Sequence, residues 1–244
     1  CAYMHTDKQL TKDLETLGVE KGDVLFVHSS FNSVGDIQGG AHTLVTALQS
    51  AVCDDGLVLM PAFNLIDWNQ RHKHWDINKT KSTVGWLTEY FRTMENTHRS
   101  DHYSHSVCAR GFGANKYVSR HLEKVGLRSR WDREGWGFTF GTYSPMYQAY
   151  LNEGKILMIG VDYESSTYVH LAEVIYRTTC LDGENIHAHP FSNLSRVGEF
   201  WESAGELSVG NVGDAACKLF NIREYVDTVS KEFSVNMDKY LEHM

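Results

Sequence analysis

The first quarter of the chain switches between the hydrophobic spacing of a helix and that of a strand. Leu10, Leu14 and Leu17 lie three or four residues apart, as on one face of a helix, and Gly18 follows where a C-cap glycine would stand. VLFVHS is then a short apolar run typical of a buried strand, and a loop rich in Ser and Gly leads to the next helical pattern. The expected elements are a helix over residues 6–17, a strand over 24–29, a helix over 42–52 and a strand over 57–63.

Two long polar and aromatic stretches interrupt this pattern further along the chain. Residues 64–81 and 126–145 show neither period, which favours surface loops of the kind that shape pockets. The other segments again show the hydrophobic spacing of a helix or of a strand. They predict helices over 82–94, 114–125 and 168–179, strands over 107–113 and 155–161, and a strand or two with a helix around 213–232 in the last sixty residues.

Strands that alternate with helices predict an α/β fold, here a central mixed sheet with helices on both faces in three layers. The 244 residues fit one domain, and neither a repeat nor a linker divides them. We therefore expect a single domain over residues 1–244, in which Cys1 to Tyr3 could be a cloning or truncation remnant.

Charge and cysteine content narrow the range of partners and compartments. The net charge of -8, from 31 acidic and 23 basic residues, argues against a nucleic-acid binder, which needs a basic face, and suits a polycationic partner better. Five widely spaced cysteines form no C-x-x-C pair, so a reducing compartment is expected. The sequence has no apolar stretch near the roughly 18 residues of a membrane span, and the first residues lack a signal core. We expect a cytoplasmic protein without membrane or nucleic-acid partners, and a homodimer remains open.

Three segments carry enough polar chemistry to form a site. The first begins at His28 and Ser29, at the end of an expected strand, and continues through Ser33 and Gly35 towards a helix. Backbone N–H groups at such a turn suit a pyrophosphate, although the spacing fits neither G-x-G-x-x-G nor the Walker loop and a plain β–α turn is the alternative. The second segment is RSDHYSHS at residues 99–106, in which Arg99 could meet a phosphate and the serines an acyl carbonyl, unless it is a solvated loop.

The third segment, GVDYESSTYVHLAE at residues 160–173, directly follows the clearest strand pattern. If Ser166 or Thr167 caps the next helix, His170 lies in its first turn and Glu173 on the same face. The helix dipole there favours a neutral imidazole, which a general base requires, and Glu173 could fix its tautomer. A purely structural histidine is the alternative, but open α/β sheets bind ligands at the carboxyl ends of their strands.

Thirteen histidines also raise the question of a metal site. The candidate ligands form no H-E-x-x-H motif and no cysteine pair, and their H-x-H pairs lie in polar loops, so we expect no metal. These candidates are His72, His74, His98, His102, His105, His187 and His189.

Taken together, the segments resemble the aminoglycoside 3-N-acetyltransferase family. The resemblance runs from Leu14 to Glu173, and one departure is Tyr103, where the family's R-S-x-H-P motif has proline. The similar blocks are LGVEKGDVLFVHSSFNSVGDIQGG, GLVLMPAF, VGWLTEYFRT, HRSDHYSHSVCARG, the Ser144-Pro145 turn and GKILMIGVDYESSTYVHLAE.

The resemblance implies a set of roles for individual residues. His170 would be the catalytic base, supported by Glu173 with Thr167 nearby. The acidic residues would attract a polycationic sugar, and the candidate substrate contacts are Asp67, Glu164 or the acids in 132–134, with His102. The residues that would hold CoA are Ser29, Ser30, Phe31, Ser33, Val34, Gly35, Arg99, Ser100 and Ser106.

The activity implied is direct transfer of an acetyl group from acetyl-CoA to the 3-amino group of an aminoglycoside within a ternary complex. An acetyl-CoA-dependent transferase for a different amine is the nearest alternative. A CoA- or nucleotide-binding module without turnover and a metal hydrolase are the other two classes that the residues leave open.

Overall fold

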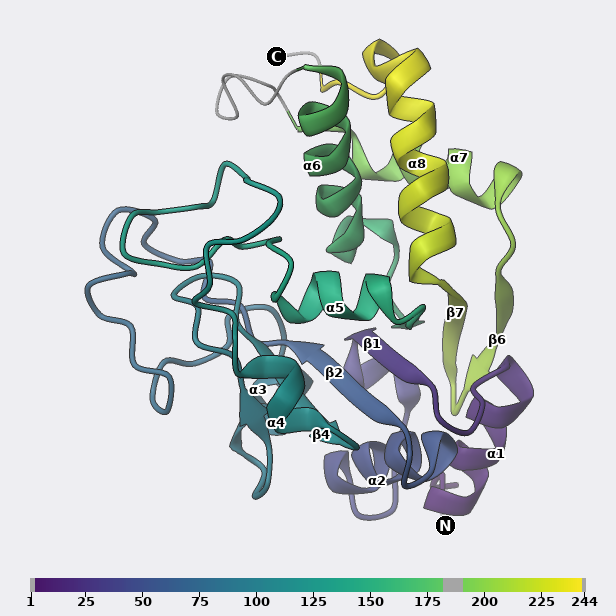
Figure 1. The fold of residues 1–244 in the computed structure, drawn as a ribbon. Helices are drawn as coiled ribbons and strands as arrows, with labels where there is room; N and C mark the ends of the chain where they lie inside the picture. The colour runs from purple at the N-terminus through teal and green to yellow at the C-terminus, as the bar shows by residue number, and fades with distance from the viewer. Residues whose placement is uncertain (1–2, 182–190, 243–244) are drawn as a thin grey trace.

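A seven-stranded mixed sheet forms the centre of the described part of the chain (Figure 1). The computed structural model describes residues 3–181 and 191–242. The strand order is β3-β4-β2-β1-β5-β7-β6; β1 is parallel to β2 and to β5, and the outer pairs are antiparallel. The strands are β1 Val24–Ser29, β2 Leu57–Pro61, β3 His98–Arg99, β4 Val107–Gly111, β5 Lys155–Ile159, β6 Ser208–Val212 and β7 Ala215–Asn221.

Side-chain alternation along the strands divides the interior into two cores. On β1, Phe26 belongs to the core beneath α4, α5, α6, α7 and α8, whereas Leu25 and Val27 belong to the core beneath α1, α2 and α3. Figure 1 shows α5, α6 and α8 on one side of the sheet and α1 and α2 on the other. The expected α/β fold, a mixed sheet flanked by helices, is confirmed. The helices are α1 Asp7–Leu17, α2 Ala41–Val52, α3 Trp86–Thr93, α4 Ala114–Val118, α5 Pro145–Leu151, α6 Tyr168–Cys180, α7 Leu194–Ala204 and α8 Ile222–Asn236.

Two helix predictions were wrong in extent. The helix expected over 114–125 ends at Val118, and His121 then turns into the interior to hydrogen-bond Ser100 and the Thr139 carbonyl. The helix expected around 213–232 begins only at Ile222, because residues 215–221 form β7. Side chains along the first part of β7 alternate between buried and more exposed, as in a strand, and this period of two was not recognised in the sequence.

Three elements were not predicted: β3, α5 and α7. In α7 the mid-helix residue Gly198 lowers the intrinsic preference for a helix. The structure explains this glycine, since a Cβ there would lie 2.2 Å from Cδ2 of Tyr163. A contact between distant segments therefore outweighs local propensity, although the N-cap Asn193, which accepts a hydrogen bond from the Arg196 amide, was a local signal.

The order of the strands brings several chain segments to one edge of the sheet. Because β1, β2 and β5 are parallel, their carboxyl ends share this edge. The antiparallel strand β4 begins there, so the loop between β3 and β4 lies at the same edge. The long loops expected over 64–81 and 126–145 contain no regular strand and lie close together at the left of Figure 1.

Candidate active site

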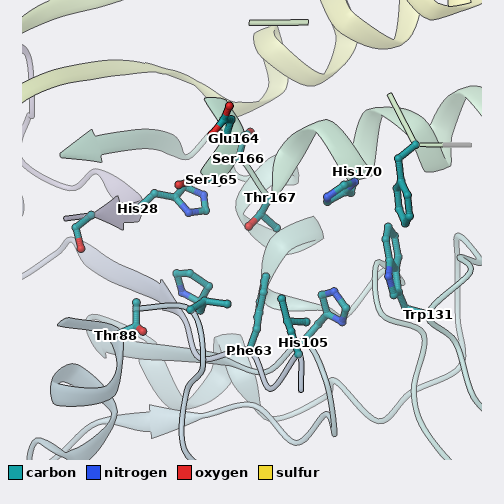
Figure 2. A pocket seen from close by; sticks show the side chains of 15 residues that line it. His28, Phe63, Thr88, His105, Trp131, Glu164, Ser165, Ser166, Thr167 and His170 are labelled. Carbon is teal, nitrogen blue, oxygen red and sulfur yellow. The ribbon is translucent and has the colours of Figure 1, made fainter. Parts of the chain in front are cut away.

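A cavity of about 410 Å³ opens at this edge (Figure 2). Its walls include His28 and Ser29 at the end of β1, Pro61 at the end of β2, and the segment 164–167 between β5 and α6. Further lining residues come from the β3–β4 loop, both long loops, α3 and α6. The cavity therefore occupies the position at which open α/β sheets bind ligands.

His170 and Glu173 form a hydrogen-bonded pair in the first two turns of α6. His170 Nδ1 lies 2.9 Å from Glu173 Oε2, with the imidazole side chain 24% exposed and the carboxylate 1% exposed. Thr167 holds the N-cap position of α6, although its side chain makes no capping bond. The expectation that His170 and Glu173 share one helix face is thus met, and only the histidine lines the cavity.

Glu173 remains ionised although it is buried. Burial raises the pKa of this carboxyl, but the charge and hydrogen bond of His170 and two hydrogen bonds from Ser192 outweigh that effect and leave the pKa below its ordinary value. Its Oε1 accepts from the Ser192 backbone N–H at 3.0 Å and from the Ser192 hydroxyl at 2.5 Å. An ionised carboxylate is only an acceptor, so His170 Nδ1 carries the proton and Nε2 is left to accept one when the ring is neutral.

Aromatic rings surround the exposed part of His170. Trp131 contacts it with ring centroids 5.1 Å apart, and Phe191 lies at 5.9 Å. Figure 2 shows His170 and Trp131 next to each other at one end of the cavity. These rings exclude water from part of the imidazole, which strengthens electrostatic interactions near it.

Two further imidazoles line the cavity, and both are nearly buried. Burial lowers the pKa of His28 to about 4. Burial also lowers the pKa of His105 well below its ordinary value, with smaller effects of the same sign from His170, Arg71 and His121. Both rings are therefore neutral near pH 7.

The structure brings several of the expected site residues to the cavity. Thr167, Ser29 and Glu164 line it together with His170. The Ser29 Oγ atom is buried and has no hydrogen-bond partner among the described residues. Glu164 is exposed, which leaves its carboxylate available at the wall.

The turn that follows β1 holds the remaining residues expected there, namely Ser30, Phe31, Ser33, Val34 and Gly35. Ser33 Oγ donates to the Ser30 carbonyl at 2.6 Å, which closes the 3-10 turn. The Val34 side chain is fully buried, so only its backbone could meet a ligand. Phe31 is partly exposed and packs on Trp86 at 5.0 Å.

Arg99, Ser100 and Ser106, which are expected to hold the cofactor, do not line the cavity and are hydrogen-bonded within the protein. Arg99 donates to the Ser106 hydroxyl and to three backbone carbonyls, those of Ile77, Thr80 and Ala62, at 2.6–3.0 Å. Ser106 Oγ donates to the Ala62 carbonyl, and Ser100 Oγ bonds His121 and the Val107 amide. Both serines are fully buried. These polar groups serve the fold because their hydrogen-bonding capacity is used within the protein.

His102 and Asp67, which are expected to contact the substrate, do not line the cavity either. His102 is fully buried, accepts a bond from the His105 amide and stacks on His121, so it cannot contact a substrate in this conformation. Asp67 is exposed on the first long loop and does not line the cavity.

Sequence reasoning missed several residues of the site. His28 stood in a selected motif without a role, and His105 was weighed only as a metal ligand; the burial of both rings was the missing observation. Trp131 and Ser192 come from segments without periodicity, so the sequence carried no signal that would place them beside His170 and Glu173.

The described residues do not gather three His, Cys, Asp or Glu side chains in a metal-binding arrangement. The pairs His72 with His74 and His98 with His102 therefore complete no such group, and His187 and His189 lie outside the described residues. Among the described helices, none combines the length and apolar character that a membrane crossing requires.

The fold and the cavity define an α/β protein with a histidine–carboxylate pair at the ligand-binding edge of its sheet. The model of the aminoglycoside 3-N-acetyltransferase family matches residues 26–234. The chain belongs to this family and so to the acyltransferases.

Three comparisons show how far the likeness extends. The SPbeta prophage-derived aminoglycoside N(3')-acetyltransferase-like protein YokD of Bacillus subtilis (strain 168) is 30% identical, over 98% of this chain and 96% of that protein. Its crystal structure superposes with a TM-score of 0.77, over 98% of this chain and 97% of that one. Aminoglycoside N(3)-acetyltransferase III of Salmonella sp is 27% identical, over 86% of this chain and 74% of the relative. The structure of AAC-IIIb binary with CoASH, 20% identical, has a TM-score of 0.76 over 99% of this chain and 100% of that chain.

Proposed function

We propose that this protein transfers the acetyl group of acetyl-CoA directly to the 3-amino group of an aminoglycoside, with His170 as general base. The observation that carries the proposal is the His170–Glu173 pair at the wall of the cavity. Membership of the family supports the reaction, as do the name of the Salmonella relative and the CoASH complex of AAC-IIIb.

The geometry around His170 suits proton removal from an amine. An aliphatic amine is largely protonated near pH 7 and cannot attack a thioester until it loses a proton. The part of the acceptor that binds as free amine attacks, and His170 Nε2 accepts the proton that its nitrogen loses as the new C–N bond forms. Nδ1–H stays on Glu173, whose negative charge stabilises the imidazolium that forms. Ser192 holds the carboxylate in place through two hydrogen bonds and thereby sets the orientation of the ring.

The donor is assigned to the turn that follows β1. Ser29 lines the cavity, and its buried Oγ has no hydrogen-bond partner in the part of the chain that the structure describes; a ligand would offset the cost of burying this atom. The turn of residues 30–35 continues from it, and its Gly35 has a φ of 85°. Glu164, which lines the cavity from the segment before α6, is the acid we assign to a cationic acceptor.

One experiment tests the reaction directly. The protein is incubated with acetyl-CoA and a panel of aminoglycosides, free thiol is measured, and any product is located by mass and NMR. The proposal expects acetyl on the 3-amino nitrogen. Acetylation at another position, or acetyl-CoA binding without thiol release, would contradict it.

A different amine acceptor is the second candidate, and the composition of the wall favours it. Of the described residues that line the cavity, Glu164 alone carries a carboxylate, and Arg130 stacks on Phe191 at 4.1 Å. A less cationic acceptor with apolar surface would suit such a wall better than a polycation. Aliphatic and aromatic monoamines in the same panel, with the same thiol readout, separate the two candidates.

A further inference from the structure

His105 is a nearly buried histidine that has no role in the proton transfer described above. It lies in the β3–β4 loop and is 5% exposed, and that exposed part lines the cavity. Its ring packs between Phe63, at 4.8 Å, and Trp131, at 5.4 Å. Figure 2 shows the three side chains side by side, with the His105 ring on the side of the cavity facing His170.

The hydrogen bonds behind His105 determine which of its nitrogens carries the proton. His102 Nδ1 accepts from the backbone N–H of His105 at 3.0 Å and of Ser104 at 3.3 Å, so this nitrogen is unprotonated and its single lone pair is occupied. The Ser104 hydroxyl lies 3.4 Å from that nitrogen and only 2.8 Å from His105 Nδ1. We therefore assign the hydrogen of this hydroxyl to His105 Nδ1, which makes that nitrogen the acceptor.

This arrangement leaves Nε2 of His105 as an N–H donor. Burial, reinforced by the charge of Arg71 and by that of His170 when it is protonated, holds the pKa of His105 well below its ordinary value, so the ring stays neutral. A neutral ring whose Nδ1 accepts a hydrogen bond carries its proton on Nε2. It can donate a hydrogen bond from Nε2–H to an oxygen without transferring the proton.

His105 and His170 act on the same part of the cavity. Both rings contact Trp131, at 5.4 Å and 5.1 Å respectively. A proton acceptor and a neutral donor thus face one space, which is what attack of an amine on a carbonyl requires, because negative charge develops on the carbonyl oxygen as the amine loses its proton.

We propose that His105 hydrogen-bonds through Nε2–H to the carbonyl oxygen of the acetyl thioester and stabilises the oxyanion that forms there. This inference rests on the proposed acetyl transfer. The amine nitrogen forms a bond to the carbonyl carbon, the carbonyl π electrons move to the oxygen, and His170 takes the amine proton. The C–S bond then breaks as the carbonyl re-forms, and the thiolate takes the proton from His170.

His28, the other neutral imidazole of the wall, is less suited to this role. Its Nε2 is buried and has no hydrogen-bond partner among the described residues. No contact of that nitrogen therefore determines whether it carries the proton that a ligand oxygen would accept. His105 offers a donor that is set in place before any ligand binds, and pre-organisation is what makes oxyanion stabilisation effective.

Two substitutions test the donor and its orientation. His105→Phe keeps the ring volume and removes the N–H, and it should lower kcat by about 10²–10³ while the Kd of acetyl-CoA changes little. Ser104→Ala leaves His105 in place but frees its tautomer, and a loss of about tenfold is expected. In both variants the rise of kcat with pH due to the base should remain. Wild-type kcat in His105→Phe would overturn the inference.

A spectroscopic measurement gives a readout that does not depend on turnover. With acetyl-CoA labelled with ¹³C at the carbonyl, the C=O stretching band should lie at lower frequency when bound to the wild type than when bound to His105→Phe. Equal frequencies in a variant that binds acetyl-CoA with nearly the Kd of the wild type would overturn the inference, whatever its kcat.

The two proposals fail in different ways. If the wild type releases no thiol with any amine, the acetyl transfer itself is wrong. If the wild type turns over and the His105 variants match it, only the oxyanion role is wrong. His121→Phe is the matched control, since His121 is also buried and, among the described residues, hydrogen-bonds Ser100 and the Thr139 carbonyl but not Ser104. It should lose stability and keep kcat per folded molecule, and a loss of kcat as large as that of His105→Phe would count against a specific role for His105.

Discussion

The polar residues of the expected site are of two kinds. Some have a hydrogen-bonding atom that faces the cavity, and others use all such atoms in bonds within the protein. His170 belongs to the first group because Nδ1 is bonded to Glu173 and the rest of the ring meets the cavity. Arg99 belongs to the second group, with four hydrogen bonds to neighbouring groups. This difference leads to opposite predictions for the two residues.

His170→Gln should lower kcat by about 10²–10⁴, the usual contribution of a general base, with little change in acetyl-CoA affinity or thermal midpoint. The glutamine amide can still donate to Glu173, so the carboxylate does not lose its partner. Steady-state kinetics, calorimetry and thermal unfolding measure the three quantities. His42→Gln is the control, since His42 also stands in the first turn of a helix but is exposed there. A variant with wild-type kcat and reduced stability would show that His170 is structural.

Arg99→Ala should destabilise the fold by at least about 2 kcal/mol, because it leaves backbone carbonyls of the first long loop without their charged donor. The Kd of acetyl-CoA for the folded variant should stay within about threefold of the wild type. Urea unfolding and calorimetry test the two parts. An intact stability with much weaker acetyl-CoA binding would return Arg99 to the cofactor site.

At the scale of elements, the turn after β1 is held against the end of β5. Gly160 follows β5 with a φ of 63°, and a Cβ there would lie 1.9 Å from Ser33 Oγ. Ser33 in turn closes the 3-10 turn through its bond to Ser30. The position of the proposed CoA-binding turn therefore depends on a glycine outside it.

Gly160→Ala should cost about 1–2 kcal/mol from the left-handed backbone and also weaken acetyl-CoA binding by about tenfold, because Ser33 must move. Gly40→Ala is the matched control: its φ is 65°, but nothing lies within 4 Å of the added Cβ. It should lose similar stability without the change in Kd. Equal Kd values in the two variants would show that the turn does not bind the donor.

At the scale of the whole molecule, four buried histidines link stability to pH. Burial lowers the pKa of His28 and His121 to about 4, and that of His102 and His105 well below the ordinary value of 6.5. In the unfolded chain all four titrate near 6.5, so below that pH the unfolded state binds more protons than the folded state. These histidines do not lower the free energy of unfolding above pH 6.5, where both states are neutral. They lower it progressively as the pH falls towards 4, because the unfolded state then gains protons that the folded state does not.

The free energy of unfolding should therefore fall between pH 6.5 and pH 4, by up to about 1.4 kcal/mol per pH unit for each histidine. The net charge of -8 opposes this trend weakly, since acidic self-repulsion declines as the pH approaches the pI of about 5.9. Urea unfolding at pH 7, 6 and 5 measures the slope, and His121→Phe should reduce it. A free energy that is flat from pH 7 to pH 5 would contradict the burial of these rings.

The sequence by itself determined the elements whose signals are local. Thr6 accepts a hydrogen bond from the Gln9 amide and Gly18 closes α1 with a φ of 120°, which agrees with the leucine spacing between them. The pattern also placed His170 and Glu173 on one face of α6, because three residues nearly complete one helical turn.

The tertiary structure alone decided which polar residues are free to act. RSDHYSHS reads as one polar segment, yet its Arg99, Ser100 and Ser106 are bonded within the fold while His105 reaches the cavity. Trp131 and Ser192, distant in sequence from His170 and Glu173, lie beside them only after folding. The reason is physical: local periodicity depends on neighbours a few residues apart, whereas burial and hydrogen-bond partners depend on segments that the chain topology brings together.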